Sequence, residues 1–477
     1  MRALVLASLP FLIAAVPTAQ DAAPDGAVAL STATTPPSVA DALDAALADH
    51  PELRPLYDGA PLWPDGALNA FLQAAVLDGL PAELAALTRG DDARALAARD
   101  VATTRALLAL AETWSGTRAD PAALYPGRWH APRRRTDPVA LVRGAAADDD
   151  PAQAVQAALA ALHPPHAEYR RLRQRARQIR RAVARAASRP LPAAPPRVDG
   201  APADVPELPA IPHLGEARHL DQVELALERW RWLPAELGAR HVWVNIPAFE
   251  LAVREGEHGR YRDRLRMPAT VGQAEAHWQT PVLSDRIVAA SFFPTWTPTV
   301  TIQREEILPQ ARRDGGAELD SLGFFVERRG RRLSPRDVDW DRARAGQYRI
   351  VQRGGPLGRL GRIKFVMPND QYILIHDTTT PDEFDAETRA FSHGCVRAGD
   401  VEALADEVLG LANGWAPGRA SGMLRGAPRS RSVRLRERLP VHLVYLTAEV
   451  TEGGELVLYD DLYGLDAPLA EALRAAR

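Results

Sequence analysis

The amino-acid sequence predicts an α+β fold in which an all-α N-terminal domain precedes a mostly-β domain. Between residues 38 and 187, apolar side chains recur at spacings of three and four, the period of amphipathic helices. From residue 241 onward, short apolar or alternating segments bounded by turn residues indicate β-strands. Residues 188–216 are rich in proline and predict an extended linker between the two domains.

Composition limits the classes of protein that this chain can be. Of its 477 residues, 46% are hydrophobic and 25% are charged, which is typical of a folded globular protein. A net charge of −3 gives no reason to expect a nucleic-acid partner.

The first residues have the layout of a secretory signal peptide. Arg2 is followed by an apolar run from Ala3 to Val16 and by Ala19, so we assign residues 1–20 to a signal and expect a periplasmic protein. The run is short for a bilayer span, although an uncleaved anchor is the alternative. The Ala-, Pro- and Thr-rich residues 21–37 predict a mobile leader.

The all-α domain is assigned to residues 38–187. Its helices are expected near residues 39–47, 67–77, 102–114 and 152–162, with core aromatic side chains from Trp63, Trp114 and Trp129. An arginine-dense helix over Tyr169–Arg185 is interpreted as a solvated face, with an anionic-polymer patch as the alternative. His163 and His166 flank two prolines, which favours a turn over a metal site.

The mostly-β domain is assigned to residues 217–477. A short helix over 219–232 leads into strands expected near 241–246, 249–253, 262–271, 286–293 and 348–352, and closing strands near 441–450 and 456–459. Helices are expected at 401–411, capped by Asp400, and at 467–477. A long insertion between Trp296 and Gln347 contains its own helix over 303–312, and a plain surface excursion is one interpretation of it.

Cys395 is the only cysteine, and His376 lies 19 positions before it. A lone thiol in an exported chain is intermolecular, reactive, or buried and inert. A catalytic thiol needs a neighbouring imidazole or a similar positive environment, which His376 is able to provide. The apolar segment Gln371–Ile375 predicts a strand that ends at His376 and turns its ring toward a cleft.

The residues around the cysteine fit a nucleophile turn. Gly394 has no side chain, so the amides of Gly394 and Cys395 are expected to point at a developing oxyanion, with His393 as a further donor. Ser392 is expected to bond its own turn, and Arg397 either braces the loop or binds a substrate carboxylate. Core packing gives no reason for a glycine and a second histidine beside an inert thiol.

Two further features concern the surroundings of His376. Asp377 is adjacent in sequence, but neighbouring strand residues face opposite ways, so a backbone carbonyl is the better candidate to orient the imidazole. Lys364 is the only lysine in a chain that otherwise uses arginine, which indicates that a compact ammonium is needed there. We expect no metal ion and no cofactor.

His376 with Thr379, together with the Ser-His-Gly-Cys-Val-Arg string ending at Arg397, resembles the signature of the YkuD-type L,D-transpeptidase catalytic domain. The resemblance is to the large periplasmic branch of that family. It covers about residues 217–470 and continues through Leu227–Pro234, Val244–Pro247, Thr280-Pro281, Gly361–Phe365 and Asp460–Tyr463.

The resemblance implies that the insertion, residues 296–347, caps the active-site cleft and that Trp296 lies near it. Relatives often carry an aromatic residue where this chain has Leu374, and Tyr372, on the same face of the expected strand, is the candidate to replace it. The expected substrate-binding residues are Trp296, Lys364, Tyr372 and Leu374, with a packed core position as the alternative for Trp296. Family members usually carry a peptidoglycan-binding module before the Leu-Glu-Arg-Trp segment. The linker is too short and too rich in proline to hold one.

The implied reaction is acyl transfer in peptidoglycan. Cys395 would attack the carbonyl between the third residue of a stem tetrapeptide and its terminal D-Ala, and a diaminopimelate amine of a second stem would release the acyl-enzyme as a 3-3 cross-link. Carbapenems would act as inhibitors. A carboxypeptidase or endopeptidase using the same thioester and a non-catalytic wall-binding scaffold are alternatives. A papain-like enzyme is less favoured because its cysteine precedes its histidine.

Overall fold

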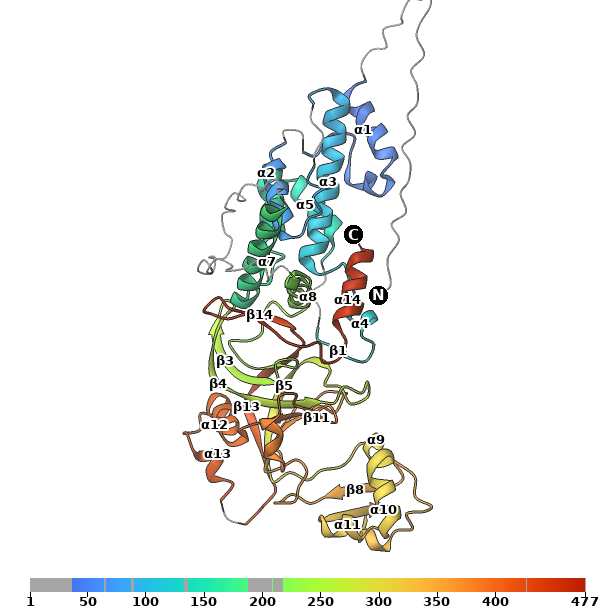
Figure 1. Ribbon diagram of the computed structural model, residues 1–477, viewed down its shortest axis with the longest axis vertical. Helices are drawn as coiled ribbons and strands as arrows, with labels where there is room; N and C mark the ends of the chain where they lie inside the picture. The colour runs from blue at the N-terminus through green and yellow to red at the C-terminus, as the bar shows by residue number, and fades with distance from the viewer. Residues whose placement is uncertain are drawn as a thin grey trace, which may run out of the picture.

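The computed structural model describes residues 37–63, 66–86, 90–132, 136–187, 208, 218–425 and 427–476. The expected signal peptide, almost all of the leader and all of the linker except Leu208 lie outside these residues. The described part is elongated (Figure 1), with the N-terminal helices at one end, a β-barrel in the middle and the insertion at the other end. This arrangement confirms the α+β class with a helical N-terminal region and a mostly-β C-terminal one.

The helices are α1 (Val39–Ala48), α2 (Asn69–Ala75), α3 (Ala93–Ser115), α4 (Pro121–Leu124), α5 (Pro138–Ala146), α6 (Pro151–Ala160), α7 (Ala167–Ala186), α8 (Leu220–Arg231), α9 (Val300–Ile302), α10 (Leu308–Asp314), α11 (Ala317–Ser321), α12 (Val401–Asn413), α13 (Arg419–Gly422) and α14 (Asp466–Ala475). Shorter turns are η1 (Pro51–Leu56), η2 (Val76–Asp78), the π-turn η4 (Gln303–Ile307), η5 (Pro335–Asp337) and η6 (Pro381–Asp385).

The strands are β1 (Trp129–His130), β2 (Arg240–Asn245), β3 (Glu250–Glu257), β4 (Arg260–Gly272), β5 (Val282–Phe292), β6 (Phe324–Arg328), β7 (Arg331–Leu333), β8 (Arg349–Gln352), β9 (Ile363–Val366), β10 (Ile375–His376), β11 (Ala390–Ser392), β12 (Val396–Ala398), β13 (Arg431–Val444), β14 (Ala448–Val450) and β15 (Leu456–Leu458).

The N-terminal helices begin where side-chain caps are available. Ser38 and Asp41 form a reciprocal capping box at α1, and Asp92, Asp137 and Asp150 accept hydrogen bonds from first-turn amides of α3, α5 and α6. Trp63 and Trp114 lie in the core of this region, as expected.

Trp129 does not belong to that core, so this expectation is wrong. It lies on β1, which pairs in parallel with β5, and its ring meets Trp232 edge-on with ring centroids 5.0 Å apart. The sequence before it, residues 116–128, therefore leaves the helices and reaches the barrel. Hydrophobicity alone predicts that this tryptophan is buried, but it does not predict in which of the two cores the side chain lies.

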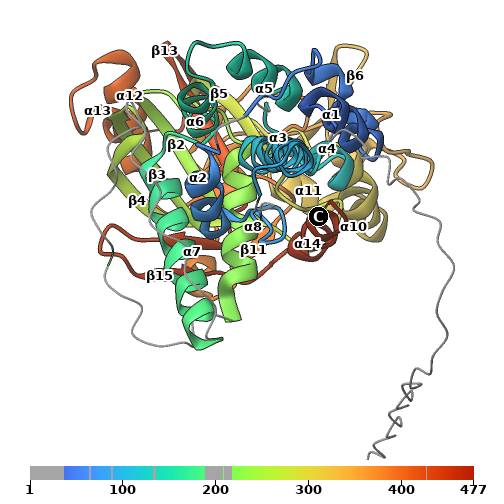
Figure 2. The ribbon, with the colours of Figure 1, turned by 90° about the horizontal axis from the view of Figure 1, so that it is seen from above.

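The arginine-dense helix α7 is not a simple solvated face. Arg173 binds both carboxylate oxygens of Asp78, Arg180 pairs with Glu224, and Arg171 donates to the carbonyl of Val450. Its apolar face, with Tyr169, packs against α8 and β14, and the views agree that α7 and α8 lie side by side between the helices and the barrel (Figures 1 and 2). Arg171 and Arg180 thus connect α7 of the N-terminal helical region to the mostly-β region.

The described linker residue, Leu208, is packed into the same cluster. Its side chain is buried, and Gln178 of α7 donates from Nε2 to its carbonyl. This single position therefore contacts the interface between the helices and the barrel.

The main sheet closes into a barrel. Eight strands follow the order β5-β13-β2-β3-β4-β12-β10-β9, and β9 pairs again with β5. Strand β1 joins the sheet at β5 and β11 at β4. Closure removes the open edges of the sheet and encloses a core rich in Val, Ile, Leu and Phe. The rims of this barrel hold the loops that form the site.

The insertion folds as a unit with its own small sheet and its own core. Strands β7, β6 and β8 form that sheet, and Ile307, Phe324 and Trp340 are buried beneath helices α9 to α11. The expected strand at 348–352 was assigned to the catalytic barrel, but β8 pairs with β6 of the insertion. The unit therefore extends beyond Gln347, because its third strand is the segment that returns the chain to the barrel.

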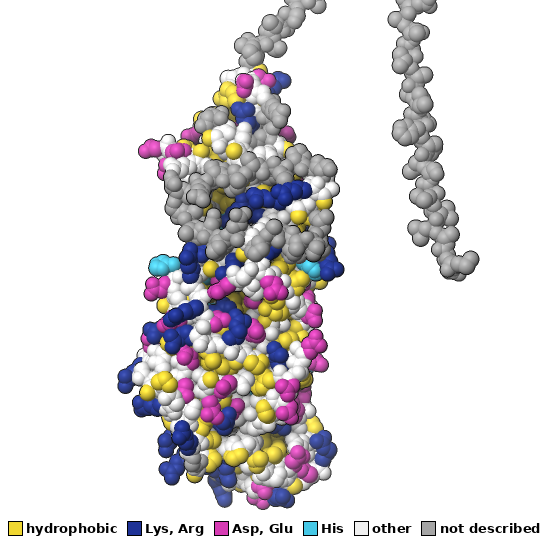
Figure 3. Space-filling model, turned by 60° about the vertical axis from the view of Figure 1, so that its left-hand side comes forward, with side chains coloured by type: hydrophobic (Ala, Val, Ile, Leu, Met, Phe, Trp, Pro, Cys, Tyr) yellow, Lys and Arg dark blue, Asp and Glu magenta, His cyan; other side chains and the backbone are white. Residues whose placement is uncertain are grey.

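A helix that crosses a bilayer needs about 20 apolar residues, and no helix within the described ranges meets that requirement. Acidic and basic side chains are interspersed over the face shown in Figure 3.

Candidate active site

Three neighbouring strands carry a row of polar side chains at the barrel rim. Across β10, His376 is the register partner of Lys364 on the antiparallel strand β9 and of Arg397 on the parallel strand β12. Register partners share one face of a sheet, so the imidazole lies between an ammonium and a guanidinium. Ile375 and Val396, one residue earlier, point instead into the barrel core and are fully buried.

Cys395 lies two residues before Arg397, so by strand alternation the two side chains lie on the same face of the sheet. Its neighbour across the strands is Leu374, whose carbonyl accepts a hydrogen bond from the amide of Val396. This register places the thiol diagonally opposite His376, and both side chains line one cavity. The fold thus brings together the two residues that the sequence selects.

The turn before the thiol is held by Ser392 and Gly394. Gly394 has a φ of 106°, a conformation that favours glycine. Ser392 Oγ accepts from the amide of Gly394 at 3.1 Å and donates to the carbonyl of Cys395 at 2.5 Å. Ser392 therefore bonds its own turn, as expected.

The same contacts correct the expected oxyanion donors. Because the Gly394 amide is already bonded to Ser392, it does not point freely at a reacting carbonyl. Among the described residues, no hydrogen bond from the Cys395 amide is recorded, so this amide is the backbone donor available beside the thiol.

The imidazole is oriented by a backbone carbonyl. His376 Nδ1 lies 2.5 Å from the carbonyl oxygen of Asp377, and since a carbonyl only accepts, Nδ1 carries the proton and Nε2 is the unprotonated nitrogen of the neutral ring. Burial, followed by the charge of Arg397, lowers the pKa of His376 to about 3, with Lys364 adding to this effect. The ring is therefore neutral at physiological pH.

Asp377 itself faces away from the imidazole, as the strand alternation predicts. Its Oδ2 accepts hydrogen bonds from the amide and Nε of Arg362, at 2.8 and 2.9 Å. Gly361 has a φ of 63°, and a Cβ there would lie 2.3 Å from the Cβ of Asp377. A glycine is needed at this position because Asp377 fills the space.

The thiol of Cys395 is half-buried and protonated at rest. Burial raises its pKa above the usual value, although the Leu374 backbone, Arg397 and Lys364 act in the opposite direction. Its Sγ lies 3.8 Å from the carbonyl of Tyr372. A protonated thiol beside a neutral imidazole is a pair in which the proton moves to the ring as the sulfur attacks.

The expected strand before His376 is mostly absent. Strand β10 contains only Ile375 and His376, and Tyr372 has a φ of 58°. Period-two alternation therefore does not apply to Tyr372 and Leu374. Both still line the cavity, Tyr372 with its side chain 76% exposed at the surface.

His393 and Arg397 each have an acidic partner. His393 Nε2 lies 2.5 Å from Glu306 Oε1 on η4, and its ring meets Trp278 edge-on. The expected oxyanion contact of His393 is therefore replaced by an ion pair with the insertion. Arg397 pairs with Glu383 of η6, which agrees with a role in bracing the loop.

The cavity around Cys395 has a volume of about 710 Å³ and lies between the barrel and the insertion. Trp296, Ile302 and Glu306 line it from the insertion side, and Thr378–Thr380 from the loop after His376. Trp296 also meets Phe324 of the small sheet edge-on. Within the described chain, no three His, Cys, Asp or Glu side chains are grouped to hold a metal ion.

Residues 239–431 match the L,D-transpeptidase catalytic domain family, YkuD. These residues are therefore similar to L,D-transpeptidase catalytic domains. Residues 57–175 match a second family, described as a scaffold domain.

A relative from Haemophilus influenzae, itself named only as a candidate L,D-transpeptidase, is 29% identical over 258 residues. The match spans 54% of this chain and 50% of the relative, so it covers about half the length of each protein.

The turn that holds Cys395 is also supported by hydrogen bonds from Thr280 and Tyr463, two residues that the sequence indicates only as part of the resemblance. Thr280 Oγ1 donates to the carbonyl of Gly394 and accepts from the amide of Gly272, both at 2.8 Å. Tyr463 OH accepts from the amide of Thr280 and donates to the carbonyl of Gly272. The sequence signal for these two residues is that Thr280-Pro281 and Asp460–Tyr463 are among the segments that resemble the family, but neither segment reveals these contacts.

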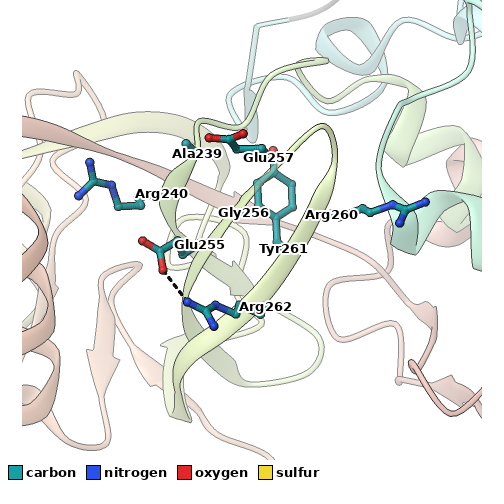
Figure 4. A pocket seen from close by; sticks show the side chains of 8 residues that line it. All are labelled: Ala239, Arg240, Glu255, Gly256, Glu257, Arg260, Tyr261 and Arg262. Atoms are coloured by element: carbon teal, nitrogen blue, oxygen red, sulfur yellow. Dashed lines mark hydrogen bonds and ion pairs between the residues drawn. The ribbon is translucent and has the colours of Figure 1, made fainter. Parts of the chain in front are cut away.

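A second cavity, of about 730 Å³, lies at the β3–β4 hairpin (Figure 4) and shares no lining residue with the cavity around Cys395. Glu255, Arg260, Tyr261 and Arg262 line it, and Glu255 pairs with Arg262 and Arg264. Its charges are largely matched by one another, and it contains neither a nucleophile nor a buried base. It is not a candidate for the reaction.

Proposed function

We propose that this protein is an exported, periplasmic peptidoglycan transpeptidase that forms 3-3 cross-links between stem peptides. The observation that carries the proposal is that the single cysteine, Cys395, lines the same cavity as a buried neutral imidazole, that of His376, whose Nδ1 is fixed by the Asp377 carbonyl. Such a pair is suited to attack a carbonyl and to form a thioester.

In the first half-reaction, His376 Nε2 takes the thiol proton while Sγ attacks the carbonyl that joins the third residue of a stem tetrapeptide to its terminal D-Ala. The Cys395 amide stabilises the developing oxyanion. His376 then gives the proton to the nitrogen of the departing D-Ala, which leaves a thioester on Cys395.

In the second half-reaction, the amine of a diaminopimelate residue on another stem attacks that thioester and the C–S bond breaks. His376 takes the proton of the amine and passes it to the departing sulfur, which restores the Cys395 thiol and leaves an amide cross-link. Trp296, Ile302 and Glu306 of the insertion line the cavity, which supports the proposal that the insertion restricts the access of water. Restricting water at the thioester favours the amine as acceptor. We therefore expect cross-linking to exceed hydrolysis.

The test uses the purified protein with disaccharide tetrapeptides that carry diaminopimelate, and separates the products by mass. Dimers joined between third-position residues support transfer, whereas tripeptide alone would make the protein a carboxypeptidase. Cys395→Ala is the matched control, because it removes only the sulfur of a half-buried side chain. Equal activity in that variant would end the assignment of the nucleophile.

The strained ring of a carbapenem offers the same type of carbonyl, so we expect one covalent adduct per chain, at Cys395. Intact-protein mass spectrometry measures it. His376→Ala should slow formation of the adduct by about 10²- to 10⁴-fold, the usual range for a lost general base. If the thiol reacts with iodoacetamide but with neither substrate nor carbapenem, a non-catalytic role is favoured.

A further inference from the structure

Four cationic side chains line the cavity around Cys395, and three of them have acidic partners. Arg349 pairs with Glu327, Arg359 with Glu306 and Arg397 with Glu383; the fourth is Lys364. Within the described part of the chain, no carboxylate pairs with Lys364, whose Nζ has only the carbonyl of Thr295 at 3.5 Å. The cavity therefore contains one cation without a counterion.

The position of this ammonium is fixed by the barrel. Lys364 lies on β9 directly opposite His376, on the face of the sheet that carries the thiol. Burial lowers the pKa of Lys364, and the charge that Cys395 can carry is the influence that raises it. A partly desolvated cation without a counterion is costly to keep, so the site is suited to receive an anion from a ligand.

The chemistry of the proposed reaction indicates which anion reaches it. In the first half-reaction His376 protonates the nitrogen of the departing D-Ala, and the α-carboxylate of that residue is attached to the carbon next to the nitrogen. In the second half-reaction the diaminopimelate amine that approaches His376 has a carboxylate on the same neighbouring carbon. In both steps an α-carboxylate lies one carbon away from the atom that exchanges a proton with His376.

We propose that Lys364 binds the α-carboxylate of the amine that leaves and of the amine that enters, so that the site selects α-amino carboxylates in both half-reactions. This inference rests on the proposed function. Arg397, the other cation beside His376, is less able to do so because Glu383 already neutralises it. Lys364 is thus a substrate-binding residue that determines specificity.

The experiment compares two donors that differ only in that carboxylate: a tetrapeptide ending in D-Ala and the same peptide ending in D-alaninamide. For the unaltered protein we expect kcat/KM to favour the free acid by about 10- to 100-fold, the range of a hydrogen bond to a charged group. In Lys364→Met the preference should fall to about threefold or less, because both donors then meet a neutral side chain. Lys364→Arg keeps the charge and should retain part of the preference.

Arg349→Met is the matched control. It removes a cation from the same cavity, but one that Glu327 already neutralises, and the preference for the free acid should persist. A cooperative urea unfolding transition confirms that each variant is folded. If Lys364→Met does not fold, the comparison of the unaltered protein with Lys364→Arg and Arg349→Met decides.

A wild-type preference that is absent, or that survives intact in Lys364→Met, would overturn the assignment. If the preference survives and Lys364→Met lowers kcat/KM equally for both donors, the result would indicate that Lys364 stabilises the oxyanion instead. If the unaltered protein is alkylated at Cys395 yet converts neither donor, the proposed function itself fails, an outcome distinct from the loss of preference.

Discussion

Glu306 of the insertion and His393 of the nucleophile turn form an ion pair, with Oε1 and Nε2 2.5 Å apart. His393 is two residues before Cys395, so the insertion is attached to the barrel beside the thiol itself. The hydrogen bond from His393 is the main cause that lowers the pKa of Glu306. The next residue of the chain, Glu305, makes a parallel contact with His277 at 3.2 Å. Two successive glutamates of the π-turn thus join the insertion to the barrel.

We expect Glu306→Gln to loosen this attachment and to admit water to the thioester. The pair is partly solvent-exposed, so the effect should be modest: the ratio of tripeptide to cross-linked dimer should rise by about two- to fivefold. Product analysis by mass measures that ratio. Asp320→Asn is the control, because Asp320 pairs with Arg336 within the insertion and neither side chain lines the cavity. An equal change in both variants would show that the contact with His393 is not the cause.

The second prediction concerns the protonation of the thiol. Because burial raises the pKa of Cys395, only a small fraction is thiolate at pH 7, and the rate of alkylation by iodoacetamide should still rise about tenfold per pH unit near pH 8.5, the usual thiol pKa. The measurement is the alkylation rate between pH 5 and 10, with a small free thiol as reference. A rate that levels off below pH 7 would indicate a resting thiolate–imidazolium pair instead.

Gly361→Ala tests how the imidazole is oriented. The new methyl group would collide with Asp377, whose carbonyl fixes His376 Nδ1, so we expect activity to fall by at least about tenfold while Cys395 is still alkylated at high pH. Gly414→Ala is the control, since Gly414 also has a positive φ, 70°, but nothing lies within 4 Å of an added Cβ. A similar loss of activity in both variants would assign the effect to backbone strain and general instability.

The fourth prediction concerns stability and pH. Burial alone would raise the pKa of Asp78, but the charges of Arg173 and Arg177 outweigh it and hold that pKa well below its usual value. The carboxylate therefore stabilises the fold at pH values above the unfolded pKa of about 4, and the contribution is lost as the pH falls below it. We expect Asp78→Asn to lower the free energy of unfolding by about 2–4 kcal/mol at pH 7, because Arg173 loses a largely buried partner.

Urea unfolding of both proteins at pH 7 and at pH 3 checks this prediction. The difference between them should shrink at pH 3, because the unfolded wild-type chain is then largely protonated at Asp78 while the folded chain is not, and this proton uptake favours unfolding. Asp44→Asn is the control, because its pair with Arg54 is exposed and should contribute little. A difference that does not change with pH would mean that Asp78 acts through packing rather than charge.

By itself the sequence selected the two candidate reacting side chains and the local elements around them. A single cysteine in a Ser-His-Gly-Cys turn and one upstream histidine were enough to select Cys395 and His376, and the Asp400 cap correctly predicted where α12 begins. Such signals are local, because helix caps, periodicity and turn residues act within a few positions of one another.

Only the tertiary structure decided which atoms those residues meet. The bond from Gly394 to Ser392, the pair of His393 with Glu306, and the free ammonium of Lys364 opposite His376 depend on a turn conformation, on the docking of the insertion and on strand register. Trp129 and β8 show the same limit, since both are apolar segments whose partners lie far away in the chain. An apolar pattern specifies that a face is buried. The closure of the barrel and the position of the insertion specify which residues pack against that face.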